Sequence, residues 1–504
     1  MAVALVLAYT VFRPPSTPGP LERDFEAYYA AGATVNAGGD PYSRGIWSVE
    51  RRIPGVNAEH DELLPYVGPA AALPLWSTLA RLPYHAAAVV WTALLAAALA
   101  GIIAAAFRLS RAAHDGPTVA WTAAFTLASA PVVSALALGQ AALVSAAGVA
   151  GALIAYRARR PAEAIGATLL AGIQPNLALA LLGRLRTPWD IALAAAAGSA
   201  FAALTLAAGG GDRGVASYLR RLAAHGAAER DVAIQHTPSA IAYSFGLAPN
   251  VAAMLGSAAA LAAVGALILC IVRERLNATS AALLTCALFP FAVPFFHEHD
   301  FVLELLPLLI LALRARGRAR ALASVAAVLL LVDWFGFAQR TAAQGQIVCL
   351  GLAVVLGFAA LQRPVGRGFP PEGWGLLVFA CLAAIALPLG RSRPAPVWPD
   401  RLPVTFHADP ATDASAVWAA EQRATGLTAR IPAWGLLRGL PLAGCIVLSA
   451  ALVAEARRLR VPTLRGDVRG TPDVRSGWSV AALARRIRRS RRRRAAARTG
   501  SSRA

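Results

Sequence analysis

The stretch YHAAAVVWTALLAAALAGIIAAAF, residues 84–107, contains no Asp, Glu, Lys or Arg. A helix of this length and composition is long enough to cross the roughly 30 Å of hydrocarbon in a bilayer. Similar apolar segments recur along the chain, in which 57% of the 504 residues are hydrophobic and 15% are charged. Soluble globular proteins are less apolar than this. The sequence therefore predicts an all-α polytopic membrane protein.

We predict about twelve transmembrane helices, formed by the apolar segments that approach the thickness of a bilayer. They are residues 1–12, 84–107, 119–138, 140–156, 189–208, 248–272, 278–296, 300–313, 321–340, 344–361, 374–390 and 435–455. Residues 161–183 have arginines before and after them and are interrupted by Gln174-Pro175-Asn176. Because proline removes a backbone donor, and irregular backbone inside a membrane must line a protein cavity, we predict a re-entrant, broken helix pair here.

The positive charge predicts the orientation in the membrane. The net charge of +21 comes from arginine clusters in short loops and in a C-terminal tail, and such loops stay in the cytoplasm. The polar segments 13–67, 209–237, 297–300 and 391–434 then face the opposite, extracytoplasmic side, where we expect loop helices and the functional site. We divide the chain into a membrane domain, residues 1–455, and a basic cytoplasmic tail, residues 456–504.

The tail has two interpretations, a helix lying on anionic lipid headgroups and a solvated disordered segment. No folded nucleic-acid-binding module accompanies its charge, so we expect no nucleic-acid partner.

Asp24 is the strongest catalytic candidate. It lies in the acidic, tyrosine-containing segment Asp24-Phe25-Glu26-Ala27-Tyr28-Tyr29, close to an apolar N-terminus. A carboxylate at a membrane face can accept a proton from a hydroxyl group while the lipid boundary holds a lipid-linked donor beside it. If the segment is helical, Asp24 and Tyr28 share one face. The alternative is that Asp24 only caps this helix.

The segment Gly38-Gly39-Asp40-Pro41-Tyr42 is typical of a turn, since glycine allows a positive φ and proline restricts its own φ. Asp40 and Tyr42 are also candidates for contacts with a sugar hydroxyl.

The cluster His297-Glu298-His299-Asp300 places four ionisable groups at a membrane edge. Three interpretations remain open here: phosphate binding by an imidazolium, a proton relay, and a metal site. Phosphate binding is favoured, because a nearby phosphate stabilises the cationic form of histidine, and because histidines two residues apart on a helix end point away from each other. We therefore predict no metal site.

Weaker candidates for substrate contacts are polar residues at helix breaks and loop ends, each of which is also explained by an interhelical hydrogen bond. They are Gln140, Gln174 and His236. The sequence contains no P-loop, dinucleotide-binding fingerprint or serine-hydrolase elbow in a usable context, which disfavours a nucleotide-driven machine and indicates no cofactor.

The order of these motifs resembles glycosyltransferase family 87, membrane-embedded enzymes of the GT-C class. The resemblance covers about residues 21–313 and the motifs on which it rests occur in one order. They are Asp24-Phe25 with Tyr28-Tyr29-Ala30-Ala31, Gly39-Asp40-Pro41-Tyr42, Tyr66-Val67-Gly68-Pro69 before Trp91, Gly139-Gln140, Gln174-Pro175, and Pro294-Phe295-Phe296-His297-Glu298-His299-Asp300 leading into Leu305-Leu306-Pro307.

The resemblance implies inverting transfer of a hexose, often mannose, from a polyprenyl-phosphate donor to a glycolipid or glycan acceptor outside the cytoplasm of a bacterial cell. It implies that Asp24 is the general base, that His297 or His299 lies near the donor phosphate, and that Asp300 belongs to the substrate site. The chain departs from the family at Gln174, where lysine often precedes the proline, and in its short first helix.

Two other functions remain open at this level. A transporter or flippase of a lipid-linked or small substrate is suggested by the many spans and the broken helix. A non-catalytic assembly partner in envelope synthesis would bind glycolipid without turnover.

Overall fold

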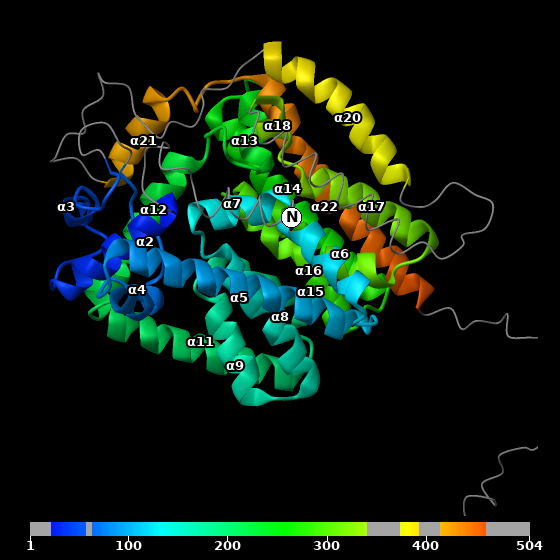
Figure 1. Cartoon of the computed structure of the whole chain (residues 1–504), viewed down its shortest axis with the longest axis horizontal. Coiled ribbons are helices and arrows are strands. Elements are labelled where there is room, and N and C mark those ends of the chain that lie inside the picture. The colour runs from blue at the N-terminus through cyan, green and yellow to red at the C-terminus, as the bar shows by residue number, and fades with distance from the viewer. Residues whose placement is uncertain (1–21, 57–62, 340–372, 393–413, 460–504) are drawn as a thin grey trace, which may run out of the picture. The chain divides into compact units, whose positions relative to one another are not determined.

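The computed structural model describes residues 22–56, 63–339, 373–392 and 414–459. Every element in these residues is a helix, which confirms the predicted all-α class, and the elements up to Arg458 belong to one compact unit (Figure 1). Two predicted spans, residues 1–12 and 344–361, and the tail from residue 460 lie outside the described residues.

The first half of the chain begins with short helices and continues into longer apolar ones. In order these are α2 (Arg23–Asn36), η1 (Arg44–Ile46), α3 (Trp47–Glu50), η2 (Ala70–Ala72), α4 (Leu73–Leu79), α5 (Tyr84–Ser110), α6 (Gly116–Leu127), α7 (Ala130–Leu138), α8 (Ala142–Ala158), α9 (Pro161–Ala171), α10 (Pro175–Ala178), η3 (Leu179–Arg184) and α11 (Pro188–Ala208).

The second half alternates polar connecting helices with apolar ones. They are α12 (Asp212–Glu229), α13 (Pro238–Ser244), α14 (Pro249–Arg273), α15 (Ala278–Leu288), η4 (Phe289–Phe291), η5 (Glu298–Phe301), α16 (Val302–Arg314), α17 (Gly317–Leu331), α18 (Trp334–Gln339), α20 (Gly373–Ser392), α21 (Ala414–Ala424) and α22 (Pro432–Arg458).

The described residues contain five helices that are long and apolar enough to cross a membrane, α5, α11, α14, α20 and α22. A sixth span is possible if α6 and α7, which meet at 64°, count as one. The predicted number of about twelve is therefore not confirmed. Helices do occupy the other described segments, but α8, α15, α16 and α17 have 17 residues or fewer.

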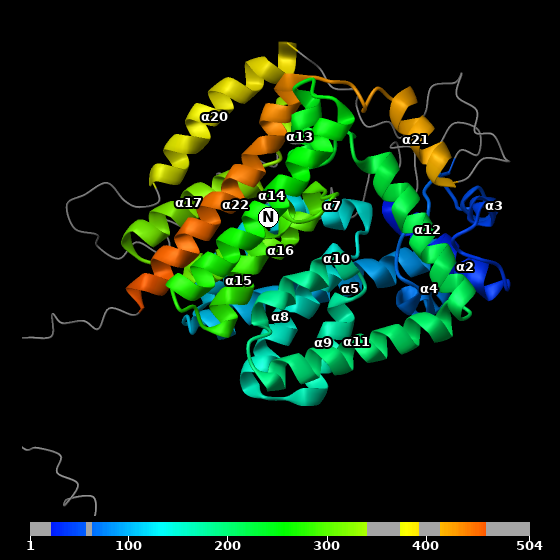
Figure 2. The ribbon, with the colours of Figure 1, turned by 180° about the vertical axis from the view of Figure 1, so that it is seen from behind.

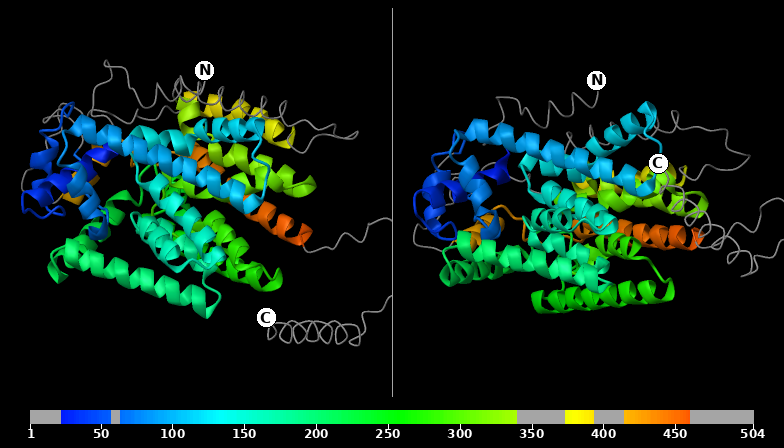
Figure 3. Two further views of the ribbon diagram at one scale, coloured as in Figure 1. Left: turned by 60° about the horizontal axis from the view of Figure 1, so that its bottom comes forward. Right: turned by 90° about the horizontal axis from the view of Figure 1, so that it is seen from below.

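Helix α16 shows why apolar sequence alone does not identify a membrane span. Its residues from Val302 to Leu311 are all buried, and it packs against α5, α8, α15, α17 and α22. Its hydrophobic composition therefore reflects a protein core, in which an apolar run of 10–14 residues is common. Helix α14 is the opposite case, because Met254, Leu261 and Val272 are each at least two-thirds exposed. It lies at an outer edge in the right panel of Figure 3, where lipid would cover these side chains.

The predicted break at Gln174-Pro175 is confirmed. Helix α9 ends at Ala171, and Pro175 occupies the first turn of α10, where its missing N–H needs no partner. The short elements α10 and η3 then lead into α11, as Figure 2 shows from behind. The elements on both sides of the break, α9, α10 and η3, pack against α8.

The polar connecting helices gather at one end of the bundle. Figure 1 shows α2, α3, α4, α12 and α21 there, with α2 packed on α3 and α4, and α12 packed on α21. All of them except α4 come from the three long segments for which the sequence predicts a shared face. The described parts of those segments therefore lie together, as predicted.

The close packing of α2 on α4 generates a test. A Cβ at Gly32 would lie 2.2 Å from the Trp76 carbonyl oxygen. We expect Gly32→Ala to lower the free energy of unfolding by about 1–3 kcal/mol, because the two helix backbones must separate. Thermal unfolding of the purified protein in detergent measures this change.

Gly101→Ala is the matched control, because Gly101 lies in α5 with no atom within 4 Å of its added Cβ. Alanine is the better helix former by about 1 kcal/mol, so this variant should keep or raise the unfolding midpoint. A raised midpoint in both variants would contradict the packing of α2 on α4.

Candidate active site

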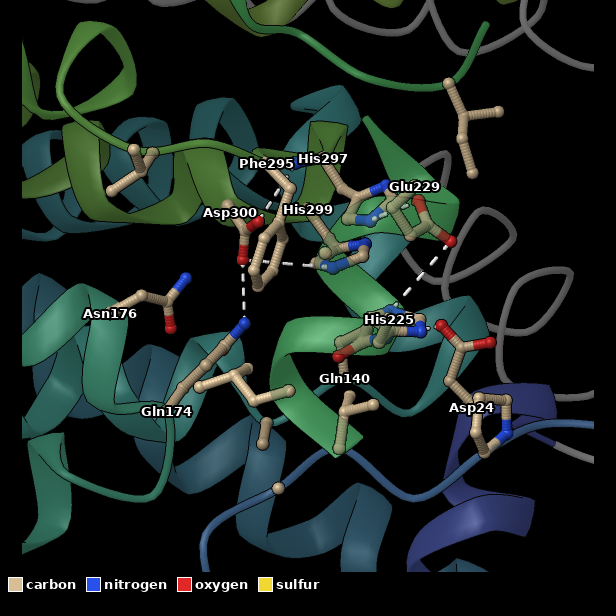
Figure 4. Close-up of a pocket in the computed structure, with 18 of the residues that line it drawn as sticks. Asp24, Gln140, Gln174, Asn176, His225, Glu229, Phe295, His297, His299 and Asp300 are labelled. Atoms are coloured by element: carbon tan, nitrogen blue, oxygen red, sulfur yellow. Dashed lines mark hydrogen bonds and ion pairs between the residues drawn. The ribbon is translucent and has the colours of Figure 1, made fainter. Parts of the chain in front are cut away.

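A cavity of about 1020 Å³ lies beside the polar connecting helices. Most of the residues singled out from the sequence line it, as shown in part in Figure 4. They are Asp24, Tyr28, Gln140, Gln174, His236, His297, His299 and Asp300. Segments far apart in the sequence thus supply one site.

Asp24 lies in the first turn of α2 and is half-buried. Its Oδ2 accepts a hydrogen bond from Nε2 of Gln140, whose Oε1 accepts one from the Tyr28 hydroxyl at 2.9 Å. Among the described residues Oδ1 of Asp24 accepts no hydrogen bond, so this oxygen is available to a ligand. The capping interpretation is wrong, because Glu22 occupies the N-cap position of α2.

Gly139 places Gln140 next to α2. Its φ of 70° lies in the left-handed region, and an added Cβ would lie 2.7 Å from Cβ of Glu22 and 2.9 Å from Cβ of Phe25. The Gly139 carbonyl oxygen accepts a hydrogen bond from Trp91 Nε1 at 2.7 Å. Both the backbone conformation and the close approach require glycine at this position.

Element η5 forms the opposite wall. Asp300 accepts hydrogen bonds from the His297 backbone N–H and from Gln174 Nε2, each at 2.9 Å, and its Oδ1 lies 3.8 Å from His299 Nε2. The imidazole rings of His297 and His299 stack with their centroids 5.2 Å apart. Asp300 therefore joins the broken helix to both histidines.

The break before α10 leaves polar atoms facing this wall. Ser145 Oγ donates to the Ala171 carbonyl oxygen at 2.6 Å and accepts from the Gln174 backbone N–H at 2.9 Å, which satisfies the interrupted backbone. Gln174 Oε1 and Asn176 Nδ2 are buried without a hydrogen-bond partner among the described residues. They can therefore bind a ligand hydroxyl, which both donates and accepts.

Asp40 and Tyr42 do not line the cavity. Asp40 is exposed, and its Oδ1 accepts from the Tyr42 backbone N–H at 2.9 Å, which closes the predicted turn. Tyr42 is buried and donates to the Gly68 carbonyl oxygen at 3.0 Å. The structure therefore gives both residues structural contacts and brings neither to the other candidate site residues.

Glu229 is a cavity residue that the sequence analysis missed. It is the last residue of α12 and is 1% exposed. Its carboxylate accepts from Gln235 Nε2 at 2.6 Å and from Trp418 Nε1, and its Oε2 lies 3.5 Å from His297 Nε2. Trp418 comes from α21, almost two hundred positions later, so no local pattern marks Glu229.

Burial determines the charge of most histidines here. It lowers the pKa of His299 and of His236 from 6.5 to about 3, with smaller contributions from His297 at His299 and from Arg438 at His236. Burial also lowers the pKa of His225. These three rings are therefore neutral near pH 7, which disfavours His299 as the phosphate-binding cation and leaves His297 as the candidate.

The pKa values of Asp300 and Glu229, two buried carboxyl groups of the cavity, shift in opposite directions. Burial raises the pKa of Asp300. Burial acts in the same sense on Glu229, but His297, His225 and the hydrogen bonds from Trp418 and Gln235 outweigh it, so the pKa of Glu229 lies below its usual value. Glu229 is therefore an ionised carboxylate. Among the described residues, no group of three or more His, Cys, Asp or Glu is placed to hold a metal ion.

A protein-family model matches part of this chain. Residues 66–294 match the model of glycosyltransferase family 87. The chain carries a glycosyltransferase family 87 domain. No curated protein matches the chain. The matched family implies a membrane glycosyltransferase, and the described residues include five helices long and apolar enough to cross a membrane.

The matched residues of the glycosyltransferase include Gln140, Gln174 and Glu229, and they end just before the His297–Asp300 cluster. Asp24 lies before them. The matched range is thus shorter than the resemblance over residues 21–313. Asp24 and the His297–Asp300 cluster lie outside the matched range, but they line the same cavity as Gln140 and Gln174, which lie within it.

The neutral state of His236 predicts a pH dependence. His236 Nδ1 donates to the Arg438 carbonyl oxygen at 3.2 Å. Because its folded pKa of about 3 lies below the ordinary 6.5, its contribution to stability is present above pH 6.5 and is lost as the pH falls towards 3. The loss amounts to at most about 1.4 kcal/mol per pH unit.

We expect His236→Gln, which keeps a donor for Arg438, to flatten the acid side of the stability profile. Unfolding midpoints of the glycosyltransferase in detergent at about pH 7.5 and about pH 5 measure this, and the wild type should lose more stability than the variant. An identical loss in both proteins would contradict a neutral buried His236.

Proposed function

We propose that this glycosyltransferase transfers a hexose, with mannose the first sugar to test, from a polyprenyl-phosphate donor to a hydroxyl group of a glycolipid or polysaccharide. We propose further that transfer takes place at the extracytoplasmic face of a bacterial plasma membrane. The observation that carries the proposal is the placement of Asp24, with one free carboxylate oxygen, in the same cavity as the His297–Asp300 cluster.

The proposed step is a single displacement with inversion. The acceptor oxygen attacks the anomeric carbon of the donor sugar, and its proton passes to Oδ1 of Asp24. The bond from the anomeric carbon to the phosphate oxygen breaks, and its electron pair leaves with the polyprenyl phosphate. A base for the acceptor and positive charge for the departing phosphate are the two groups that this step requires.

The orientation of Asp24 supports its role as the base. Gln140 holds Oδ2 through its amide nitrogen, and Tyr28 fixes the orientation of that amide. Glu229 is an ionised carboxylate at the same cavity, but its two oxygens already accept hydrogen bonds from Trp418 and Gln235. Asp24 therefore has the free oxygen that proton transfer needs.

The apolar side chains that line the cavity support a lipid-linked donor. Apolar side chains lie beside the broken helix and before η5, where an isoprenoid chain would leave the polar cluster. They are Leu138, Ile173, Leu179, Ala292 and Val293. Leu179 is about half exposed on the surface of the bundle, consistent with an exit towards lipid.

The test uses membranes that contain the protein, labelled polyprenyl-phosphate-mannose, and mass spectrometry of the products. We expect a labelled glycoconjugate from the wild type and a loss of about 10²–10⁴ in the transfer rate for Asp24→Asn, which keeps the shape and removes the base. Asp40→Asn is the matched control, since Asp40 lies outside the cavity, and it should keep full transfer.

Full transfer by Asp24→Asn would rule out the proposed mechanism. Movement of the intact labelled lipid across the membrane with no new glycosidic bond would support the flippase alternative. Labelled polyprenyl-phosphate-glucose, supplied in parallel, separates a wrong sugar from a wrong reaction class.

A further inference from the structure

Arg438 is a buried arginine at the cavity that the proposed mechanism does not yet use. It lies in the second turn of α22, one of the helices that are long and apolar enough to cross a membrane, and it is 1% exposed. Its side chain contributes to the lining of the cavity. An ionisable residue in such a helix is costly to place there, and it is usually functional.

The guanidinium of Arg438 is held by uncharged acceptors. They are the carbonyl oxygens of Trp434 at 3.2 Å from Nε and of Val232 and Gln235 at 3.2 Å and 3.1 Å from Nη1, and Oγ of Ser244 at 2.5 Å from Nη2. A guanidinium has five N–H groups. One N–H on Nη2 therefore has no acceptor among the described residues.

These contacts leave the positive charge of Arg438 uncompensated. Arginine keeps its charge in proteins. In the part of the chain that the structure describes, no carboxylate forms an ion pair with it. Glu229, a carboxylate of the same cavity, accepts its hydrogen bonds from Gln235 and Trp418. Because a buried charge without a counter-ion is unfavourable, an anionic ligand at this end of the cavity would be stabilised.

The charge of Arg438 acts on the wall that carries the histidine cluster. His236 Nδ1 lies 3.2 Å from the Arg438 carbonyl oxygen, and the His236 backbone N–H donates to the Phe296 carbonyl oxygen at 2.7 Å. Burial is the main cause of the low pKa of His236, and Arg438, His297 and His299 each lower it further. The guanidinium and the imidazoles therefore influence the same part of the cavity.

We propose that Arg438 supplies the fixed positive charge that binds the donor phosphate, with the remaining N–H on Nη2 as the donor to a phosphate oxygen. Unlike an imidazole, this side chain needs no proton uptake to carry the charge. As the bond between sugar and phosphate breaks, the negative charge that develops on the leaving oxygen is stabilised by a charge already in place. This role rests on the proposed function, because it assumes a lipid-linked phosphate in this cavity.

The experiment compares farnesyl phosphate with farnesol, which has the same chain and no charge. Binding of each to the full-length protein is measured at one detergent concentration near pH 7.5, and the ratio of the two affinities is the phosphate preference. We expect Arg438→Gln to lower this preference about tenfold or more and to change farnesol affinity little, because it removes the charge and keeps an amide for the neighbouring carbonyl oxygens.

Two further variants accompany this one. Arg457→Gln is the matched control, because it removes an arginine at the other end of α22, where the side chain is 63% exposed and pairs with Glu274, and it should keep the wild-type preference. Arg438→Lys keeps a positive charge and loses the planar set of donors, so it should retain more of the preference than Arg438→Gln.

The wild type provides a test that does not depend on a variant folding. Between about pH 7 and pH 8 the phosphate of the ligand is already largely a dianion, and an imidazole of ordinary pKa loses most of its remaining charge. Arginine does not titrate in this range. We therefore expect the phosphate preference of the wild type to stay constant, and a severalfold loss would assign the binding charge to another group and overturn the proposal.

An unchanged phosphate preference in Arg438→Gln would overturn the role of Arg438 and leave the proposed function in place. Equal weakening of both ligands, or a preference in Arg438→Lys as low as in Arg438→Gln, would overturn it as well, since either result indicates a structural role. A wild type that shows no preference for the phosphate and transfers no labelled mannose would refute the proposed function, and the role of Arg438 with it.

Discussion

The side-chain amide of Gln140 joins the N-terminal helix to the membrane bundle, and the geometry of the site depends on it. It donates to Asp24 on α2 and accepts from Tyr28 one turn later, so both halves of the amide are used. This arrangement is possible because Gly139 adopts a positive φ and lies against Glu22 and Phe25 without a side chain of its own. A carboxylate in a half-buried position is thus held in one orientation, with its second oxygen left for a ligand.

On the opposite wall of the cavity, formed by η5 and the broken helix, the polar groups are paired because unpaired polar groups inside an apolar bundle cost free energy. Ser145 satisfies the backbone at the break between α9 and α10, and Asp300 accepts from both Gln174 and His297. Among the described residues, Gln174 Oε1 and Asn176 Nδ2 have no hydrogen-bond partner, and both residues line the cavity. Unsatisfied polar atoms at the end of a satisfied network are what a site for a hydroxyl-rich ligand provides.

Much of the architecture could be predicted from the pattern of apolar and polar residues. The helical class, the helix that carries Asp24, the turn at Asp40 and the break at Pro175 depend on local sequence, and the structure has all of them. The predicted number of spans is not confirmed, because an apolar helix such as α16 has the same composition whether protein or lipid surrounds it. Asp40 and Tyr42 were candidates by residue type, but their side chains are used in the turn and in the packing around it.

The sequence by itself determined that the chain is helical and that a helix breaks at Pro175, because prolines and apolar periodicity act over a few residues. It also brought Asp24, His297 and Asp300 forward as candidates, because ionisable residues are rare at a membrane edge. Only the tertiary structure decided which polar residues meet. Glu229 acquires its partners from Trp418 and His297, which lie far along the chain, and burial, which no local pattern encodes, makes His299 neutral. Charge state and pairing depend on what surrounds a side chain, and that is a property of the folded chain.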